Sequence, residues 1–291
     1  MSGTFVRLVE VGPRDGLQNE KTHIPAERKI ELINRLNATG LKDIEISAFV
    51  NPRAVPQMAD AAEVCAGIER EPDIRYWVLV PNMQGLEAAI AANIRHIAVF
   101  TAASDAFNLK NIRKTIAESI DVFRPVVHHA KAEGLTVRGY ISTAFHCPEL
   151  LKADRTGKIA PEVVLPVCRD LLAIGCDELS IGDTIGRATP EDTESALKLW
   201  TQELPVDKLA MHFHDTFGHA LDNIRVSLTH GIRTFDASVG GLGGCPYAEG
   251  ATGNVASESV VRLLHSMGYE TGIDENKLAE AGRFIRGVLI Q

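Results

Sequence analysis

The feature that most constrains the fold is a regular alternation of short β-type runs with longer helical patterns. We expect strands at residues 5–11, 42–47, 75–80, 96–100, 136–141, 177–181, 209–214 and 234–238. Helices are expected at residues 26–39, 58–69, 84–92, 112–133, 161–174, 190–202, 220–230 and 255–267, with a last one at 275–289. Strand–helix units repeated at about 30-residue spacing predict an α/β fold with a parallel sheet.

Two parallel architectures fit this alternation: a closed TIM (β/α)8 barrel and a doubly wound open sheet. The open sheet usually carries a G-x-G-x-x-G turn after its first strand, but here the sequence reads VGPRDG at residues 11–16. No linker or low-complexity segment divides the 291 residues. We therefore expect a single TIM-barrel catalytic domain over residues 1–291, with a C-terminal helical extension.

Composition excludes several classes of partner. The 45% hydrophobic content is typical of a soluble globular protein, and the net charge of -8 without a dense Lys/Arg run argues against nucleic acid. No apolar segment is long enough for a membrane helix, and an early strand leaves no room for a signal peptide. The five cysteines include no C-x-x-C pair, so a reducing cytoplasm is the simplest compartment. A homodimer is expected only from the general frequency of two-fold oligomers.

In a barrel, functional side chains lie where strands end and βα loops begin. The first strand ends in a Gly-Pro bend that carries Arg14 and Asp15 into a polar loop. Asp15 is a candidate oxygen ligand for a divalent cation and Arg14 a candidate anion-binding group; a surface ion pair is the alternative. Glu45 lies between two isoleucines near the end of the second strand, where an inward carboxylate requires a partner or a metal. A shifted register would instead leave Glu45 in solvent.

The seventh strand ends in MHFHD, residues 211–215. Because residues i and i+2 of a strand share a face, His212 and His214 can converge on one point. An H-x-H pair also occurs in packed cores, but Asp15 and Glu45 at equivalent strand ends favour a divalent-metal site.

Two further segments carry candidate residues. Asp183 lies between glycines at the end of the sixth strand and is a candidate acid/base or supporting group; a turn or helix cap is the alternative. Residues 239–254 form a glycine-rich loop that we expect to act as a lid over the barrel mouth. Cys245 in this loop is placed to expose its thiol, and Asn254 at its end offers an amide oxygen to a metal. A plain flexible connector is the alternative.

Five segments resemble the hydroxymethylglutaryl-CoA lyase family. They are EVGPRDGLQNEK (10–21), SAFVNPRAVPQM (47–58), GDTIG (182–186), HFHDTFG (212–218) and GGLGGCPYAEGATGNVASE (240–258). The matches run in order over nearly the whole chain. Claisen-condensing synthases and aldolases of the wider superfamily share the barrel and metal site but generally lack the GGCPYA loop, so they are the weaker alternative. A metal-binding barrel without catalysis would tolerate damaged site residues, whereas every matched position is intact.

The resemblance implies a metal-dependent carbon–carbon lyase acting on an acyl-CoA. In that family, Mg²⁺ or Mn²⁺ is bound at positions matching Asp15, His212, His214 and Asn254. The implied reaction is retro-Claisen cleavage of 3-hydroxy-3-methylglutaryl-CoA to acetyl-CoA and acetoacetate, as in leucine degradation. Arg14 matches the arginine that stabilises the enolate.

The resemblance also implies roles for several residues near the metal. Cys245 matches the lid cysteine that takes part in proton transfer, and Glu45, Asp183 and His212 match acid/base or supporting positions whose roles the sequence does not separate. Lys21 is a candidate contact for the CoA phosphates.

The segment from Cys147 to Lys158 departs from the family pattern because it is longer than the usual loop after the fifth strand. Ala48 also replaces a common hydroxyl residue. These changes either reshape the acyl pocket, which would suit another 3-hydroxy-3-alkylglutaryl-CoA, or are neutral surface variation.

Overall fold

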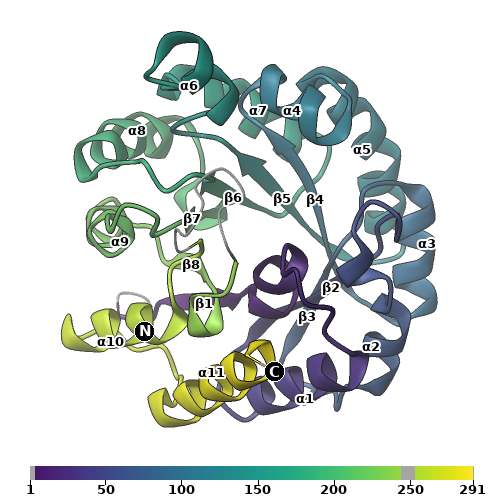
Figure 1. The fold of residues 1–291 in the computed structure, drawn as a ribbon. Helices are drawn as coiled ribbons and strands as arrows, with labels where there is room; N and C mark the ends of the chain where they lie inside the picture. Colours follow the sequence, from purple (N-terminus) through teal and green to yellow (C-terminus); the bar gives the residue numbers. More distant parts are fainter. Residues whose placement is uncertain (1–3, 244–252, 291) are drawn as a thin grey trace.

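The computed structural model describes residues 4–243 and 253–290 and contains a closed parallel barrel with its strands in chain order (Figure 1). The strands are β1 (Arg7–Glu10), β2 (Asp43–Ala48), β3 (Arg75–Leu79), β4 (His96–Ala102), β5 (Thr136–Ser142), β6 (Glu178–Asp183), β7 (Leu209–Phe213) and β8 (Thr234–Ala237). Each pairs in parallel with its neighbours, and β8 closes the barrel on β1. All eight expected strands and the closed barrel are confirmed, and the open sheet is excluded.

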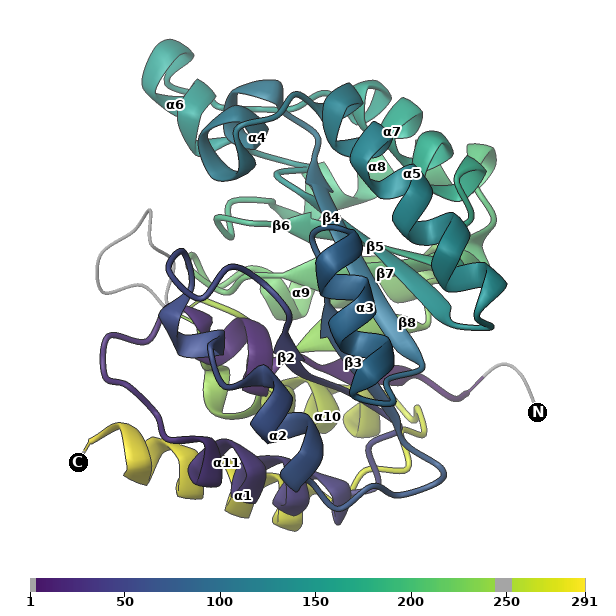
Figure 2. The ribbon, with the colours of Figure 1, turned by 90° about the vertical axis from the view of Figure 1, so that its right-hand side faces the viewer.

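Helices surround the barrel and cover its outer face (Figures 1 and 2). The expected ones are α1 (Ala26–Asn37), α2 (Ala61–Gly67), α3 (Met83–Ala91), α5 (Ile116–Ala132), α7 (Pro161–Ala173), α8 (Pro190–Glu203), α9 (Ala220–Thr229) and α10 (Ser257–Ser266). The predicted C-terminal extension is α11 (Glu275–Leu289), which packs against α1. Short helical turns occur at η1 (Gly12–Gly16), η2 (Pro56–Met58), η3 (Val206–Lys208) and η4 (Val239–Gly241).

Local signals explain where several helices begin and end. Thr189 caps α8 through a reciprocal capping box with Asp192, followed by Pro190 at the first helical position. Gly40 follows α1 at φ +93°, and a Cβ atom there would lie 2.1 Å from the carbonyl oxygen of Gly272. Glycine is therefore required at this close approach between the α1 turn and the segment before α11.

Two helices were not expected from the sequence, α4 (Asp105–Ile112) and α6 (Pro148–Asp154). The helix expected at 112–133 is in fact α5, because Arg113 ends α4 in the left-handed conformation and Thr115 caps α5 in a capping box with Glu118. Both extra helices lie in βα loops, after β4 and β5 respectively.

The α6 segment is closed at its base by backbone hydrogen bonds. Cys147 N donates to Gly157 O at 2.7 Å, and Ile159 N donates to Phe145 O at 2.8 Å. From α6, Glu149 forms an ion pair with Lys110 of α4. The long loop is therefore a side branch whose two ends lie next to each other.

Charged side chains from the starts of several strands and from the barrel interior form a network, here called the floor cluster. Its members are Arg7, Asp43, Arg75, Arg138, Glu178 and Asp236. Arg138 is buried and pairs with Asp236 at 2.6 Å and with Glu178 at 2.9 Å. Each cation of the floor cluster has a carboxylate partner.

Among the residues that the structure describes, none of the helices has the length and apolar character needed to cross a membrane.

Candidate active site

A cavity of about 660 Å³ opens at the C-terminal ends of the strands. Arg14, Asp15, His212, His214 and Asn254 all border it. These residues come from the loop after β1, from β7 and the residue just beyond it, and from the segment that leads into α10. The structure therefore places all five residues at the barrel mouth, where the sequence predicted them.

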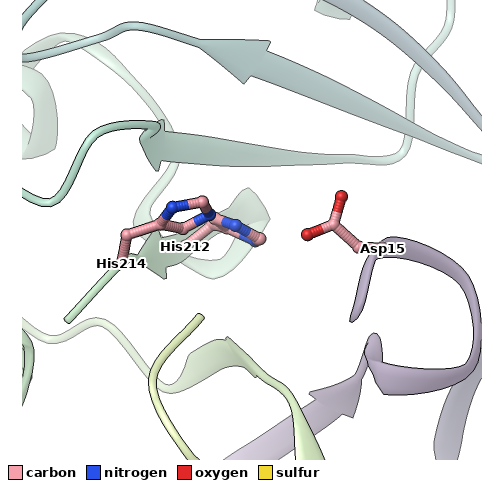
Figure 3. A group of neighbouring side chains, drawn as sticks. All are labelled: Asp15, His212 and His214. Atoms are coloured by element: carbon pink, nitrogen blue, oxygen red, sulfur yellow. The ribbon is translucent and has the colours of Figure 1, made fainter. Parts of the chain in front are cut away.

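Asp15, His212 and His214 form a group suited to a metal ion. One ligand atom from each lies within 4.8 Å of the others, and Figure 3 shows the carboxylate facing the two imidazoles. Asn254 Nδ2 donates to Asp15 Oδ2 at 2.8 Å, and His214 and Asn254 form an isolated backbone bridge. The Nδ1 atom of His214 is buried without a hydrogen-bond partner among the described residues. A carboxylate, two imidazoles and an adjacent amide are a donor set that fits a divalent cation.

Tight packing around the loop after β1 fixes the position of Asp15. This loop is the π-helical turn η1, whose Gly16 lies against the end of β8 and the segment that follows. A Cβ atom on Gly16 would be 2.7 Å from Ser238 Oγ and 2.8 Å from Leu242 Cβ. A glycine at this position therefore lets the loop lie against the segment that leads to Asn254.

The charges of the site shift several pKa values. Burial would raise the pKa of Asp15, but Arg14 and the two histidines lower it to about 2, so the carboxylate is ionised. Burial and the neighbouring His212 lower the pKa of His214 to about 3. Burial alone would lower the pKa of His212, but its hydrogen bond to Asp236 and the charge of Asp236 raise it. Neutral imidazole is the form that binds a metal, and His214 is held in that form.

Arg14 is buried at the cavity wall between two carboxylates. Its Nη1 atom lies 2.8 Å from Asp15 Oδ1 and its Nη2 atom 2.7 Å from Glu45 Oε2. The Tyr140 ring lies on another side of the guanidinium, with its centroid 5.4 Å from Cζ. Glu45 is fully buried, which excludes the solvated register, and burial raises its pKa. Glu45 does not border the cavity itself, and Oε1 has no hydrogen-bond partner within the described chain.

Asp183 is buried at the end of β6 and is turned towards its own loop. Its oxygens accept hydrogen bonds from Arg187 N at 3.1 Å and Ala188 N at 2.9 Å. Burial raises its pKa to about 7 despite these hydrogen bonds. Asp183 thus stabilises a local turn, which was the alternative to an acid/base role. It is not among the described residues that border the cavity.

Two predicted residues lie outside this group. Cys245 belongs to residues 244–252, which fall outside the described part of the chain. Its role in a lid over the barrel mouth therefore stays a prediction. Lys21 is exposed and lies two residues beyond Asn19, which borders the cavity. Of the long loop at 147–158, no described residue borders the cavity at the mouth.

The sequence interpretation missed three buried charged residues that support the site. Asp236 contacts His212, and Arg138 pairs with Asp236. Glu10 accepts hydrogen bonds from Gly12 N and Val239 N, both at 2.8 Å, and from Ser257 Oγ at 2.6 Å, so it joins the η1 loop to the start of the glycine-rich segment. A charged residue inside a buried strand was the signal used for Glu45, and the same signal identifies these three.

Comparison with known proteins points to one family. The family model described as HMGL-like matches residues 5–285. The chain is 50% identical over 281 residues to "3-hydroxy-3-methylglutaryl-CoA lyase, cytoplasmic" of Rattus norvegicus, covering 97% of this chain and 80% of the relative. It is also 50% identical over 284 residues to "3-hydroxy-3-isohexenylglutaryl-CoA/hydroxy-methylglutaryl-CoA lyase" of Pseudomonas aeruginosa, covering 98% and 93% of the two chains. The crystal structure of the HMG-CoA lyase from Brucella melitensis superimposes with a TM-score of 0.95 at 51% identity, covering 99% of this chain and 100% of the other. The chain therefore belongs to the HMGL-like family.

Proposed function

We propose that this protein is a metal-dependent lyase that cleaves 3-hydroxy-3-methylglutaryl-CoA to acetyl-CoA and acetoacetate. The observation that carries the proposal is the convergence of Asp15, His212, His214 and Arg14 on one cavity at the barrel mouth. The relatives at about 50% identity are named as lyases of this thioester, which supports the same substrate here.

Asp15, His212, His214 and Asn254 would hold the cation, and we propose Mg²⁺ or Mn²⁺. The ionised Asp15 and the buried, unpartnered Nδ1 of His214 support this assignment. When bound, a divalent cation supplies Lewis-acid polarisation of substrate oxygens and makes a hydroxyl proton easier to remove.

Arg14 is proposed to stabilise the negative charge that develops on the thioester oxygen when the carbon–carbon bond breaks. Its guanidinium is fixed by Glu45 and Asp15, so it needs little reorganisation during the reaction. Glu45 thus has a clear positioning role, because its carboxylate lies behind Arg14 and outside the cavity wall. Its Oε1 atom remains open to a proton or to a rearranged Arg14.

The proton transfers require groups that reach the cavity. His212 borders it, whereas Asp183 is held by its own loop and would act through that loop or through His212. We propose Cys245 as the thiol that takes part in proton transfer to the enolate carbon, with the loop at 239–254 acting as the lid. We propose Lys21 as a contact for the CoA phosphates, because it is exposed and follows Asn19, which borders the cavity, by two residues.

A second acyl group is favoured by one observation: the name of the Pseudomonas aeruginosa relative includes an isohexenyl-substituted glutaryl-CoA. A related 3-hydroxy-3-alkylglutaryl-CoA is therefore the second candidate substrate. We also propose a homodimer and a cytoplasmic location, the latter supported by the name of the rat relative.

The test is cleavage of 3-hydroxy-3-methylglutaryl-CoA by chelator-treated protein before and after addition of Mg²⁺ or Mn²⁺, with acetoacetate as the readout. We expect no turnover without metal and restored turnover with either cation. The control is Asp15→Asn protein treated in the same way, which should stay inactive. Absence of turnover with every divalent cation tested would reject the proposal.

A further inference from the structure

Behind the candidate metal ligands lies one carboxylate, Asp236, to which neither the sequence motifs nor the relatives' names assign a role. We propose that Asp236 is a positioning residue, which holds His212 in the tautomer and ring orientation that bind a cation. The inference rests on the proposed metal site. It can fail or hold independently of the identity of the acyl-CoA.

Asp236 lies in β8 with its side chain fully buried, and its two oxygens are fully engaged. Oδ1 accepts a hydrogen bond from Arg138 Nη2 at 2.6 Å. Oδ2 accepts from Ser180 Oγ at 2.7 Å and lies 3.1 Å from His212 Nδ1. An ionised carboxylate can only accept hydrogen bonds, so Nδ1 of His212 must carry the proton in this contact.

The hydrogen bond determines what the other side of the ring can do. Neutral imidazole carries one N–H group, so a proton on Nδ1 leaves the lone pair on Nε2. His212 supplies one atom of the group with Asp15 and His214, and the lone pair of Nε2 is then available to that group. Carboxylates that fix a metal-binding histidine in this way are a general device of metal sites.

The two histidines of the site differ in this respect. His214 Nδ1 has no hydrogen-bond partner among the described residues, so its tautomer is not fixed by the protein. His212 is held from behind by Asp236, one strand away in the barrel. His212 is therefore the ligand with a fixed orientation, and the site is asymmetric before any cation binds.

Asp236 also pairs with Arg138, so a purely structural role as counter-ion must be separated from a positioning role. Arg138 has a second carboxylate partner, Glu178, whose Oε1 lies 2.9 Å from Arg138 Nε. No hydrogen bond or ion pair joins Glu178 to His212 in the described structure. Glu178→Gln therefore disturbs the same arginine without touching the metal site and serves as the matched control for Asp236→Asn.

The first experiment is titration of metal-free protein with Mn²⁺ in a calorimeter, with thermal unfolding recorded for each variant. We expect Asp236→Asn to raise the Kd for Mn²⁺ by roughly 10- to 100-fold, because the amide allows the wrong tautomer of His212. Glu178→Gln should change that Kd by less than about twofold while lowering thermal stability. Unchanged Mn²⁺ affinity in Asp236→Asn, or an equal loss in both variants, would overturn the inference.

The second experiment uses the unmutated protein and therefore remains decisive if Asp236→Asn fails to fold. The ring ¹⁵N shifts of His212 in metal-free protein, assigned with His212→Gln, report which nitrogen carries the proton. We expect protonated Nδ1; a neutral ring whose only proton is on Nε2 would overturn the inference. Neither experiment needs a thioester substrate, so failure of the proposed lyase activity is recognised separately in the turnover assay.

Discussion

The floor cluster and the mouth of the barrel both bury charge, but they balance it differently. At the floor, the cations Arg7, Arg75 and Arg138 face the carboxylates Asp43, Glu178 and Asp236, three against three. At the mouth, Arg14 alone faces Asp15 and Glu45, one cation against two carboxylates. Because uncompensated buried charge is costly, the floor is complete as it stands, whereas the mouth has room for a cation.

Buried charges at the floor are balanced by one another, while those at the mouth leave an excess of carboxylate that a cation could balance. Substitutions at the floor should therefore change mainly the free energy of unfolding, and substitutions at the mouth should change metal binding and turnover. Asp236 belongs to both sides, because it pairs with Arg138 and also contacts His212.

The largest effect is expected from Arg138→Met at the floor. Removing this arginine takes the arginine partner from the fully buried Asp236, while Glu178 keeps Arg7, and should cost about 3–5 kcal/mol of the free energy of unfolding. Urea denaturation measures this difference. The control is Arg75→Met, whose side chain is 40% exposed and whose partner Asp43 keeps Arg7; its cost should stay below about 1 kcal/mol. A similar loss of stability in both variants would contradict a difference between the buried and the partly exposed arginines of the floor cluster.

At the mouth, Asp15→Asn should lower kcat by roughly 10²- to 10³-fold and abolish measurable Mn²⁺ binding. The substitution keeps the size of the side chain but removes the negative charge next to the two histidines. Steady-state kinetics and calorimetric titration check the two expectations. Tight Mn²⁺ binding by this variant would place the cation elsewhere.

Arg14→Gln should lower kcat by roughly 10²-fold with intact Mn²⁺ binding, because we propose that Arg14 acts on the substrate and not as a metal ligand. Its exposed counterpart Arg28, paired with Glu31 on α1, provides the control. Arg28→Gln should leave kcat unchanged. Near-normal turnover in Arg14→Gln would reject the enolate-stabilising role.

The smallest effect per pH unit concerns Glu10, which joins the η1 loop to the segment after β8 and whose pKa burial raises from 4.5 to about 7. The folded protein retains this proton at a pH where the unfolded chain has lost it. The contribution of Glu10 to stability is therefore complete below about pH 4.5 and is lost as the pH rises through about 7.

Glu10→Gln should remove this dependence, flattening the stability profile between these pH values by at most roughly 1.4 kcal/mol per pH unit. Urea denaturation at a series of pH values compares the variant with the parent protein. Parallel profiles would show that Glu10 does not titrate in this range.

The fold was predictable because its signals are local. The alternation of strand and helix patterns depends on neighbouring residues only, and the strands that it predicts are confirmed at β1 to β8. α4 and α6 were missed because they are short helices inside βα loops, where no regular repeat requires them.

The sequence predicted only those residues of the candidate site that lie at the ends of strands. Asp15 and His212 lie at such ends, and the structure brings them together. Asp236 was missed because its significance comes from partners far away in sequence: Arg138 is 98 residues from it, and His212 is 24. Such pairs depend on the register between strands and on which side chains meet inside the barrel, which the local strand patterns do not specify.

The closed base of the α6 branch has a consequence for how the chain can change. Because Cys147 and Gly157 are hydrogen-bonded to each other, the segment between them can be shortened, exchanged or extended without re-threading any strand of the barrel. None of its described residues borders the cavity at the mouth, so we expect a reporter peptide or a shorter loop introduced here to leave the candidate metal ligands in place. The barrel thus carries a side branch in which a change of length need not move the residues at the mouth.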